Sequence, residues 1–77
     1  MNKIYSVKNK EFRKFLESQG CYLKRKKGNH VIYTKKGLLR PIVFRNTGDI
    51  PILHIQKNLK TLDLTIKDLI NYLNKPK

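Results

Sequence analysis

Residues 21–46 read CYLKRKKGNHVIYTKKGLLRPIVFRN, and the succession of turn signals and strand-forming residues in this stretch decides the fold. Gly28 and Asn29 have the composition of a two-residue type II′ hairpin turn, and the HVIYTK that follows is rich in β-branched and aromatic residues. A second turn at Gly37 leads into a third strand, whose Pro41 cannot donate to a ladder and so indicates an edge position. The stretch predicts a three-stranded antiparallel meander.

The hairpin turn also predicts which side chains share a face of the sheet. The expected cross-strand pairs are Lys27 with His30, Arg25 with Ile32, and Leu23 with Thr34, with Cys21 on the same side. The opposite face then carries Tyr22, Lys24, Lys26, Val31, Tyr33 and Lys35. Tyrosines among lysines suit the stacking of nucleic-acid bases, although tyrosine is equally an ordinary residue of a half-exposed strand.

Helical patterns flank this stretch on both sides. The first predicted helix covers about residues 8–19, with apolar positions Phe12, Phe15 and Leu16, a cap from Ser6 or Asn9, and a left-handed stop at Gly20. The second covers about residues 50–62, capped by Asp49, with apolar positions Ile52, Ile55, Leu59 and Leu62. A last helix starts near Thr65 and Asp68, which have near capping-box spacing, and ends near Asn74. Residues 63–74 could serve partner contact or core burial.

The resulting order, α-β-β-β-α-α, predicts an α+β fold in a single domain over residues 1–77. The helices should cover one face of the antiparallel sheet and leave the other face to solvent or to a ligand. The predicted core consists of Phe12, Phe15, Leu16, Leu23, Ile32, Ile55, Leu59 and Leu62.

The charge is strongly and unevenly positive. Eighteen Lys and Arg against five Asp and Glu give a formal charge of +13. No acidic residue lies between Glu17 and Asp49, an interval that carries Lys24, Arg25, Lys26, Lys27, Lys35, Lys36, Arg40 and Arg45. The alternative is a charged surface that serves only solubility, but a mixture of positive and negative side chains would serve that purpose better. The pattern therefore indicates a polyanionic partner, most commonly nucleic acid.

Several other classes of protein lack support in the sequence. The N-terminus has no signal-peptide pattern, no window approaches the roughly 18 apolar residues of a membrane span, and the single Cys21 fits a reducing compartment. We therefore expect a cytoplasmic protein without a membrane partner. No metal-ligand spacing, P-loop or dinucleotide motif is present, so we expect neither a metal site nor a small-molecule cofactor.

Histidine among cations is the one constellation that could carry chemistry. Such a histidine can take a proton from an RNA 2′-OH or give one to the leaving 5′-oxygen, while Lys and Arg neutralise the crowded phosphate. DNA lacks this nucleophile, so RNA is the expected substrate. His30 is the candidate, although a histidine beside a turn is commonly only a surface residue. His54, one step from the core positions of the second helix, should point to solvent.

With a helix, a basic strand, a Gly-Asn turn and then His30, the chain resembles the HicA family of mRNA interferase toxins. Gly28-Asn29-His30 matches that family's Gly-x-His triplet at the start of the second strand, and Gly20, Leu23 and Arg25 match the approach to it. The resemblance implies a double-stranded-RNA-binding-domain-like fold, α-β-β-β-α, here with an extra C-terminal helix. It also implies ribosome-independent cleavage of mRNA and neutralisation by a HicB-type antitoxin protein.

The resemblance makes His30 the catalytic residue. The expected RNA-binding residues are Lys24, Arg25, Lys26, Lys27, Gly28, Asn29, Tyr33, Lys35 and Arg45. Many relatives carry Pro-Arg-His at the end of the third strand, where this chain has Phe44-Arg45-Asn46, so only Arg45 carries over. The alternative is a non-catalytic basic RNA-binding or ribosome-associated protein, in which His30 merely flanks a turn.

Overall fold

Three helices and a three-stranded antiparallel sheet dominate the computed structural model, which describes residues 6–74 and confirms the predicted α+β class. In chain order the elements are β1 (Ser6–Lys8), α1 (Asn9–Ser18), β2 (Tyr22–Lys27), β3 (His30–Thr34), β4 (Ile42–Arg45), β5 (Asp49–Pro51), α2 (Ile52–Thr61) and α3 (Ile66–Leu73). The expected meander is present as the sheet β2-β3-β4, in which β4, preceded by Pro41, is an edge strand as predicted.

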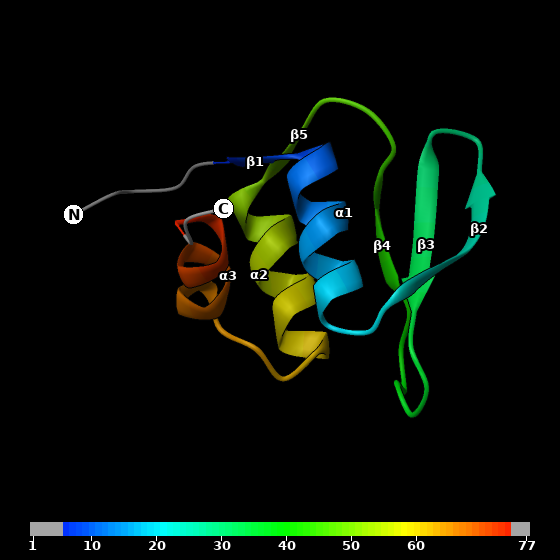
Figure 1. Cartoon of the computed structure of the whole chain (residues 1–77). Coiled ribbons are helices and arrows are strands. Elements are labelled where there is room, and N and C mark those ends of the chain that lie inside the picture. The colour runs from blue at the N-terminus through cyan, green and yellow to red at the C-terminus, as the bar shows by residue number, and fades with distance from the viewer. Residues whose placement is uncertain (1–5, 75–77) are drawn as a thin grey trace.

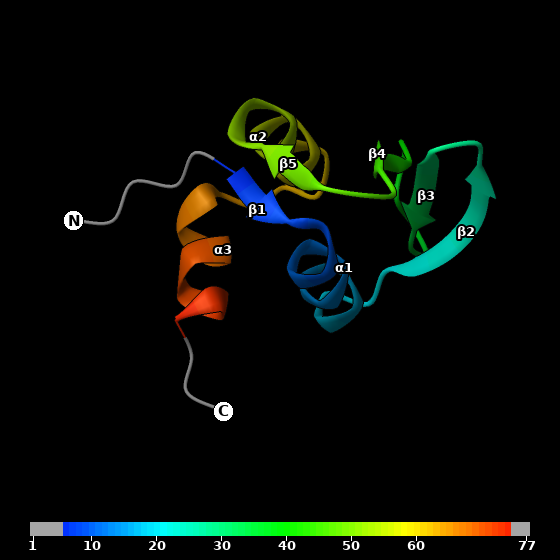
Figure 2. The same cartoon turned by 90° about the horizontal axis from the view of Figure 1, so that it is seen from above.

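The helices lie on one side of this sheet. Figures 1 and 2 show α1 and α2 between the sheet and α3, while β2 curves away beyond the area that the helices cover. Asn58 of α2 donates a side-chain hydrogen bond to the carbonyl oxygen of Val43 in β4 at 3.2 Å, which ties helix to sheet. The face of the sheet opposite the helices is left open, as expected for an antiparallel sheet with one packed face.

The core forms between the sheet and α1 and α2, and it continues between these two helices and α3. Phe12 packs edge-on against Phe44 with ring centroids 5.1 Å apart, and Phe44 stacks on Tyr33 at 5.5 Å. The buried side chains are Val7, Phe12, Phe15, Leu16, Cys21, Val31, Tyr33, Ile42, Phe44, Ile50, Ile55, Leu59, Leu62 and Leu69. The six helical positions of the predicted core are confirmed.

The two strand positions of the predicted core are wrong. Leu23 is 47% exposed and Ile32 is only half-buried, whereas Val31 and Tyr33 are buried. Ile32 lies on the face of β3 that points away from the helices, because Val31 and Tyr33 occupy the covered face. An irregularity between Leu23 and Arg25 places Leu23 opposite buried Tyr33 instead of Thr34, but β2 extends past the helices, so no β2 side chain is buried.

The hairpin turn has the conformation that its glycine predicts. Gly28 has φ +56°, whereas Asn29 does not have a positive φ, which is the type II′ pattern. Lys27 pairs with His30 across this turn, as expected, and Arg25 with Ile32. Gly20, at φ +87°, follows α1 as the predicted left-handed stop.

A second, two-stranded sheet was not predicted. β1 and β5 pair antiparallel, with Val7 opposite Ile50, and they lead directly into α1 and α2. The expected caps at Ser6, Asn9 and Asp49 are wrong because the N-cap positions fall on Lys8 and Pro51, which make no side-chain cap bond.

The predicted end signals of the last helix are confirmed. The Thr65 hydroxyl accepts from the backbone N–H of Asp68, and the Asp68 carboxylate accepts from the backbone N–H of Thr65, so a capping box starts α3. The helix ends at Leu73, with Asn74 at the C-cap. None of the helices within residues 6–74 has the length and apolar character needed to cross a membrane.

Candidate functional site

His30 lies in the middle of a row of three exposed side chains that crosses the sheet. It pairs with Lys27 on β2 and with Arg45 on β4. Directly opposite residues on neighbouring strands point to the same face, with Cβ atoms about 4.5–5.5 Å apart. An exposed imidazole therefore has one cation on each side, an arrangement that we call the His30 row.

The His30 row belongs to the open face of the sheet. Along β3, Val31 and Tyr33 are buried against the helices, so the alternate residues point outward. We call this surface the outer face, and it consists of Tyr22, Arg25, Lys27, His30, Ile32, Thr34, Val43 and Arg45. Its charges lie toward the His30 row, while Ile32 and the 43% exposed Val43 form a small apolar centre.

Hydrogen bonds join the turn before His30 to the residues after β4. The backbone N–H of Asn46 donates to the carbonyl oxygen of Asn29 at 2.7 Å. The Thr47 hydroxyl lies 3.4 Å from the side-chain oxygen of Asn29 and donates to it. The residue before His30 is thereby joined to the residues after Arg45, which fixes Arg45 relative to His30.

Two side chains of α1 form hydrogen bonds to the end of β4, the corner of the sheet next to His30. The Arg13 guanidinium donates to the side-chain oxygen of Asn46 and, at 3.4 Å, to its backbone carbonyl oxygen. The Asn9 amide donates to the carbonyl oxygen of Arg45. Arg13 thus holds Asn46 in place. The contacts of Arg13 and Asn9 were not predicted, because partners 33 and 36 positions apart leave no local pattern in the sequence.

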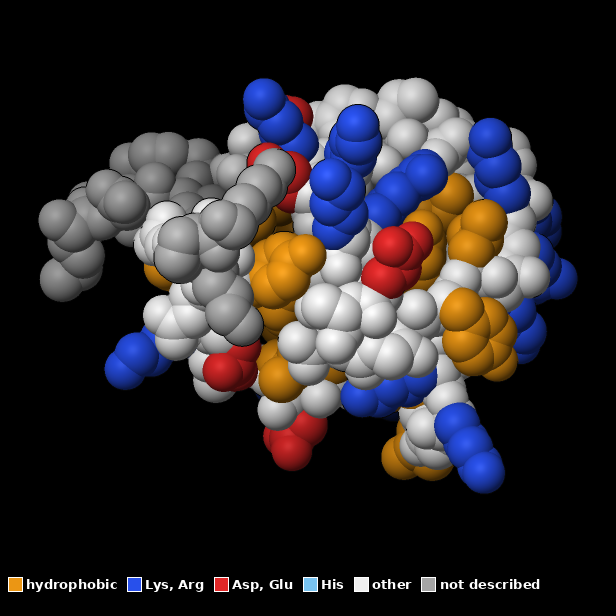
Figure 3. Space-filling view, in the orientation of Figure 1, with side chains coloured by type: hydrophobic (Ala, Val, Ile, Leu, Met, Phe, Trp, Pro, Cys, Tyr) orange, Lys and Arg blue, Asp and Glu red, His pale blue; other side chains and the backbone are white. Residues whose placement is uncertain are grey.

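The structure does not gather all the predicted cations at the His30 row. Lys24 to Lys27 are exposed along β2, but strand alternation divides them, with Arg25 and Lys27 on the outer face and Lys26 opposite buried Val31. Lys35 follows the other end of β3 and is near enough to Cys21 to oppose the rise in its thiol pKa that burial causes. In Figure 3, Lys and Arg side chains gather along the top and right of the molecule.

Tyr33 is not available to stack on a base, which corrects the expectation from sequence. Its side chain is 3% exposed and its ring stacks on Phe44. Burial raises the pKa of its hydroxyl, with Arg13 acting in the opposite direction and Glu17 reinforcing the rise. Tyr22, by contrast, is 57% exposed.

His54 is an exposed residue of α2, as predicted from its place beside core position Ile55. It belongs to an element on the opposite side of the sheet from the outer face. Within residues 6–74, no three His, Cys, Asp or Glu side chains are grouped so that they could hold a metal ion. The His30 row itself offers the chemistry of an imidazole with a cation on each side.

Comparison with the families of known proteins gives a match over most of the chain. Residues 10–64 match the protein family described as "HicA toxin of bacterial toxin-antitoxin". The matched segment runs from α1 through the sheet to α2 and ends before α3. No curated protein and no solved structure gives a significant match.

Proposed function

Because the chain belongs to the HicA family of bacterial toxin–antitoxin toxins, we propose that it is an endonuclease that cleaves mRNA independently of the ribosome and is neutralised by a HicB-type antitoxin. The observation that carries the proposal is the His30 row, an exposed imidazole between Lys27 and Arg45 on an open basic sheet. Its substrate is single-stranded mRNA, and its place of action is the cytoplasm.

Cleavage requires that one proton be removed from the RNA 2′-hydroxyl and that another be added to the departing 5′-oxygen. His30 as general base takes the proton of the RNA 2′-OH, the 2′-oxygen bonds to phosphorus, and the bond from phosphorus to the 5′-oxygen breaks. A proton from water, or from His30 acting in the reverse sense, completes the departing 5′-hydroxyl. The products are a 2′,3′-cyclic phosphate and a new 5′-hydroxyl end.

Lys27 and Arg45 supply charge where the transition state needs it. Negative charge accumulates on the nonbridging phosphate oxygens as the 2′-oxygen attacks, and a flanking cation stabilises it more than it stabilises the ground state. The Arg45 guanidinium can bind two phosphate oxygens at once, whereas Lys27 acts as a point charge. Arg25, one row away on the outer face, extends the path for the RNA backbone.

The experiment compares cleavage of a defined transcript by purified wild-type, His30→Ala, His30→Gln and His54→Ala proteins. Loss of a general acid-base group typically lowers a rate by about 10² to 10⁴, so both His30 variants should lose cleavage and toxicity, and His54→Ala should keep them. RNA affinity should survive because the cations remain. Circular dichroism checks the fold of each variant.

Two outcomes would count against the proposal. Cleavage by folded His30→Ala at the wild-type rate would remove the catalytic role. Tight RNA binding by a wild-type protein that cleaves no transcript would instead favour a non-catalytic RNA-binding protein, which an open basic sheet also suits.

A further inference from the structure

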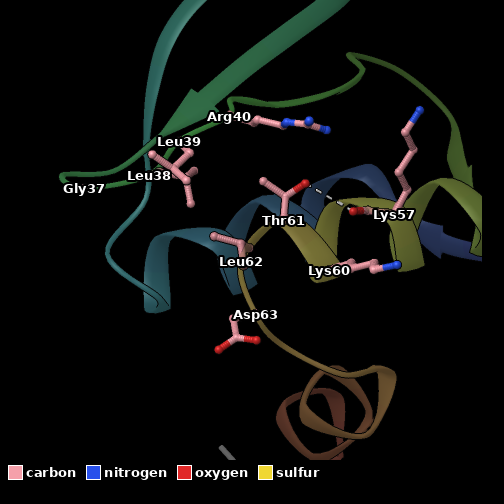
Figure 4. A pocket seen from close by; sticks show the side chains of 9 residues that line it. All are labelled: Gly37, Leu38, Leu39, Arg40, Lys57, Lys60, Thr61, Leu62 and Asp63. Carbon is pink, nitrogen blue, oxygen red and sulfur yellow. Dashed lines mark hydrogen bonds between the residues drawn. The ribbon is translucent and has the colours of Figure 1, made fainter.

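A groove lies at the end of the molecule that the His30 row does not occupy (Figure 4). It has a volume of about 680 Å³ and runs between the β3–β4 loop and the C-terminal half of α2. Its lining residues are Gly37, Leu38, Leu39, Arg40, Lys57, Lys60, Thr61, Leu62 and Asp63. β3 begins at His30 and spans about 13 Å at roughly 3.3 Å per residue, so the groove lies beyond the far end of that strand.

Turns fix both walls of the groove. On the loop side, the backbone N–H of Leu38 donates to the carbonyl oxygen of Lys35 at 3.1 Å. On the helix side, Leu64 N–H donates to Leu59 C=O at 2.8 Å and Asp63 N–H donates to Lys60 C=O at 3.0 Å, which closes the end of α2. A groove with fixed walls costs little ordering when a ligand binds.

The lining combines cations with an exposed apolar side chain. Arg40, Lys57 and Lys60 are exposed, against the single carboxylate of Asp63. Leu39 is 99% exposed, the highest value among the large exposed hydrophobic side chains. Single exposed leucines are common, but one that stands beside a cationic groove offers an apolar contact and charge contacts to the same ligand.

This lining suits a protein better than RNA. Single-stranded RNA gains much of its affinity by stacking bases on aromatic side chains, and none of the nine lining residues is aromatic. Leu39 and the Asp63 carboxylate would both be poor neighbours for a phosphate backbone. A carboxylate-rich polypeptide segment can instead pair with the cations and bury an apolar side chain against Leu39.

We propose that this groove docks an acidic segment of a partner protein, with carboxylates on Arg40, Lys57 and Lys60 and an aliphatic or aromatic side chain against Leu39. A toxin of a toxin–antitoxin system has the antitoxin as a partner that could supply such a segment. The docking site does not depend on the chemistry of His30. Because it lies away from the outer face, RNA and the acidic segment bind without competing.

The experiment selects peptides from a displayed random library against the immobilised full-length protein. Enriched peptides should share several Asp or Glu with one or two apolar residues, and one of them is synthesised with a fluorophore. Fluorescence polarisation should show at least about tenfold weaker binding to Leu39→Ser and to Lys57→Glu. Lys67→Glu, the same charge change on an exposed residue of α3, should bind the peptide like wild type.

Three results would overturn the proposal: no enrichment of acidic peptides, equal weakening by Lys57→Glu and Lys67→Glu, or displacement of the peptide by a single-stranded RNA oligonucleotide. Thermal unfolding followed by circular dichroism shows that each variant is folded. His30→Ala should bind the peptide normally whether or not it cleaves RNA. The docking site and the nuclease proposal therefore fail in different assays.

Discussion

At the scale of single residues, Arg13 is expected to matter more than its place on a helix suggests. It contributes two hydrogen bonds to Asn46, and its half-buried side chain supports the corner that fixes Arg45 beside His30. Arg13→Ala leaves the Asn46 oxygen without this donor, so unfolding free energy should fall by about 1–3 kcal/mol. The single-turnover rate of cleavage should fall by a larger factor than the affinity for RNA does.

The matched control for Arg13→Ala is Lys14→Ala, which removes an exposed cation from the next position of α1. Urea unfolding and single-turnover cleavage are measured on both variants. If the two behave alike, Arg13 acts only through its charge, and the bracing role is wrong.

Cys21 and Tyr33 give stability a defined dependence on pH. Burial raises the pKa of the Cys21 thiol above its ordinary value of 9.0, partly opposed by Lys35, and raises that of Tyr33 above 10.0. The unfolded chain therefore releases these protons at lower pH than the native protein does. The stability that the neutral groups provide is complete below about pH 9 and is lost as pH rises through the native pKa values.

Urea unfolding between pH 7.5 and 10.5, under reducing conditions, measures this loss. In Cys21→Ala the contribution of the thiol is absent, so the difference in unfolding free energy between wild type and variant should shrink above pH 9. A constant difference across this range would mean that the thiol ionises equally in both states.

The sequence predicts residues of the site well where a local pattern specifies them and poorly where distant contacts do. The Gly28-Asn29 turn and the pairing of Lys27 with His30 follow from composition over a few positions. The alternation along β3 does not say which of its two faces the helices cover, so Ile32 was placed in the core that Val31 and Tyr33 occupy. Nor does a local pattern show that β2 extends past the helices, which is why Leu23 is exposed.

At the scale of elements, α3 completes the core. Leu69 is fully buried and Tyr72 packs edge-on against Phe15 with ring centroids 5.3 Å apart. Of the two roles expected for residues 63–74, core burial is therefore confirmed. α3 lies outside the segment that matches the family, so this chain carries part of its core beyond the matched region.

Leu69→Ala should cost about 2–5 kcal/mol of unfolding free energy, since it removes a large side chain from a closed site. Lys67→Ala, on the exposed side of the same helix, should change it by less than about 0.5 kcal/mol. Thermal and urea unfolding provide the comparison. Equal stability of the two variants would mean that α3 is not docked in solution.

Long elements with strong periodicity were predicted, and short ones formed by distant pairing were not. α1, α2 and α3 carry apolar residues at helical spacing, and their type and order agree with the prediction. β1 and β5 have three residues each, too few for a pattern, and Val7 meets Ile50 only because the chain returns across the fold. The two strands lead directly into α1 and α2, so the N-cap positions fall on Lys8 and Pro51 instead of the predicted residues.

At the scale of the whole molecule, the charge of +13 attracts any polyanion, but only cations in contact with the RNA release counterions from it. If Arg25, Lys27 and Arg45 each neutralise one phosphate of a single strand, log Kd should rise with log salt concentration with a slope of about 2. Removing Arg25 and Lys27 together should lower that slope by about 1.4.

Lys57→Ala with Lys60→Ala removes the same charge from the groove and should leave the slope unchanged, because the net charge sets the approach of RNA and not its contacts. Fluorescence polarisation of a labelled oligonucleotide between 50 and 300 mM salt, on uncleavable RNA with 2′-O-methyl groups, separates these cases. A slope that falls equally in both double variants would place the RNA across the whole surface, and a slope that falls only in the groove variant would move the RNA from the outer face to the groove.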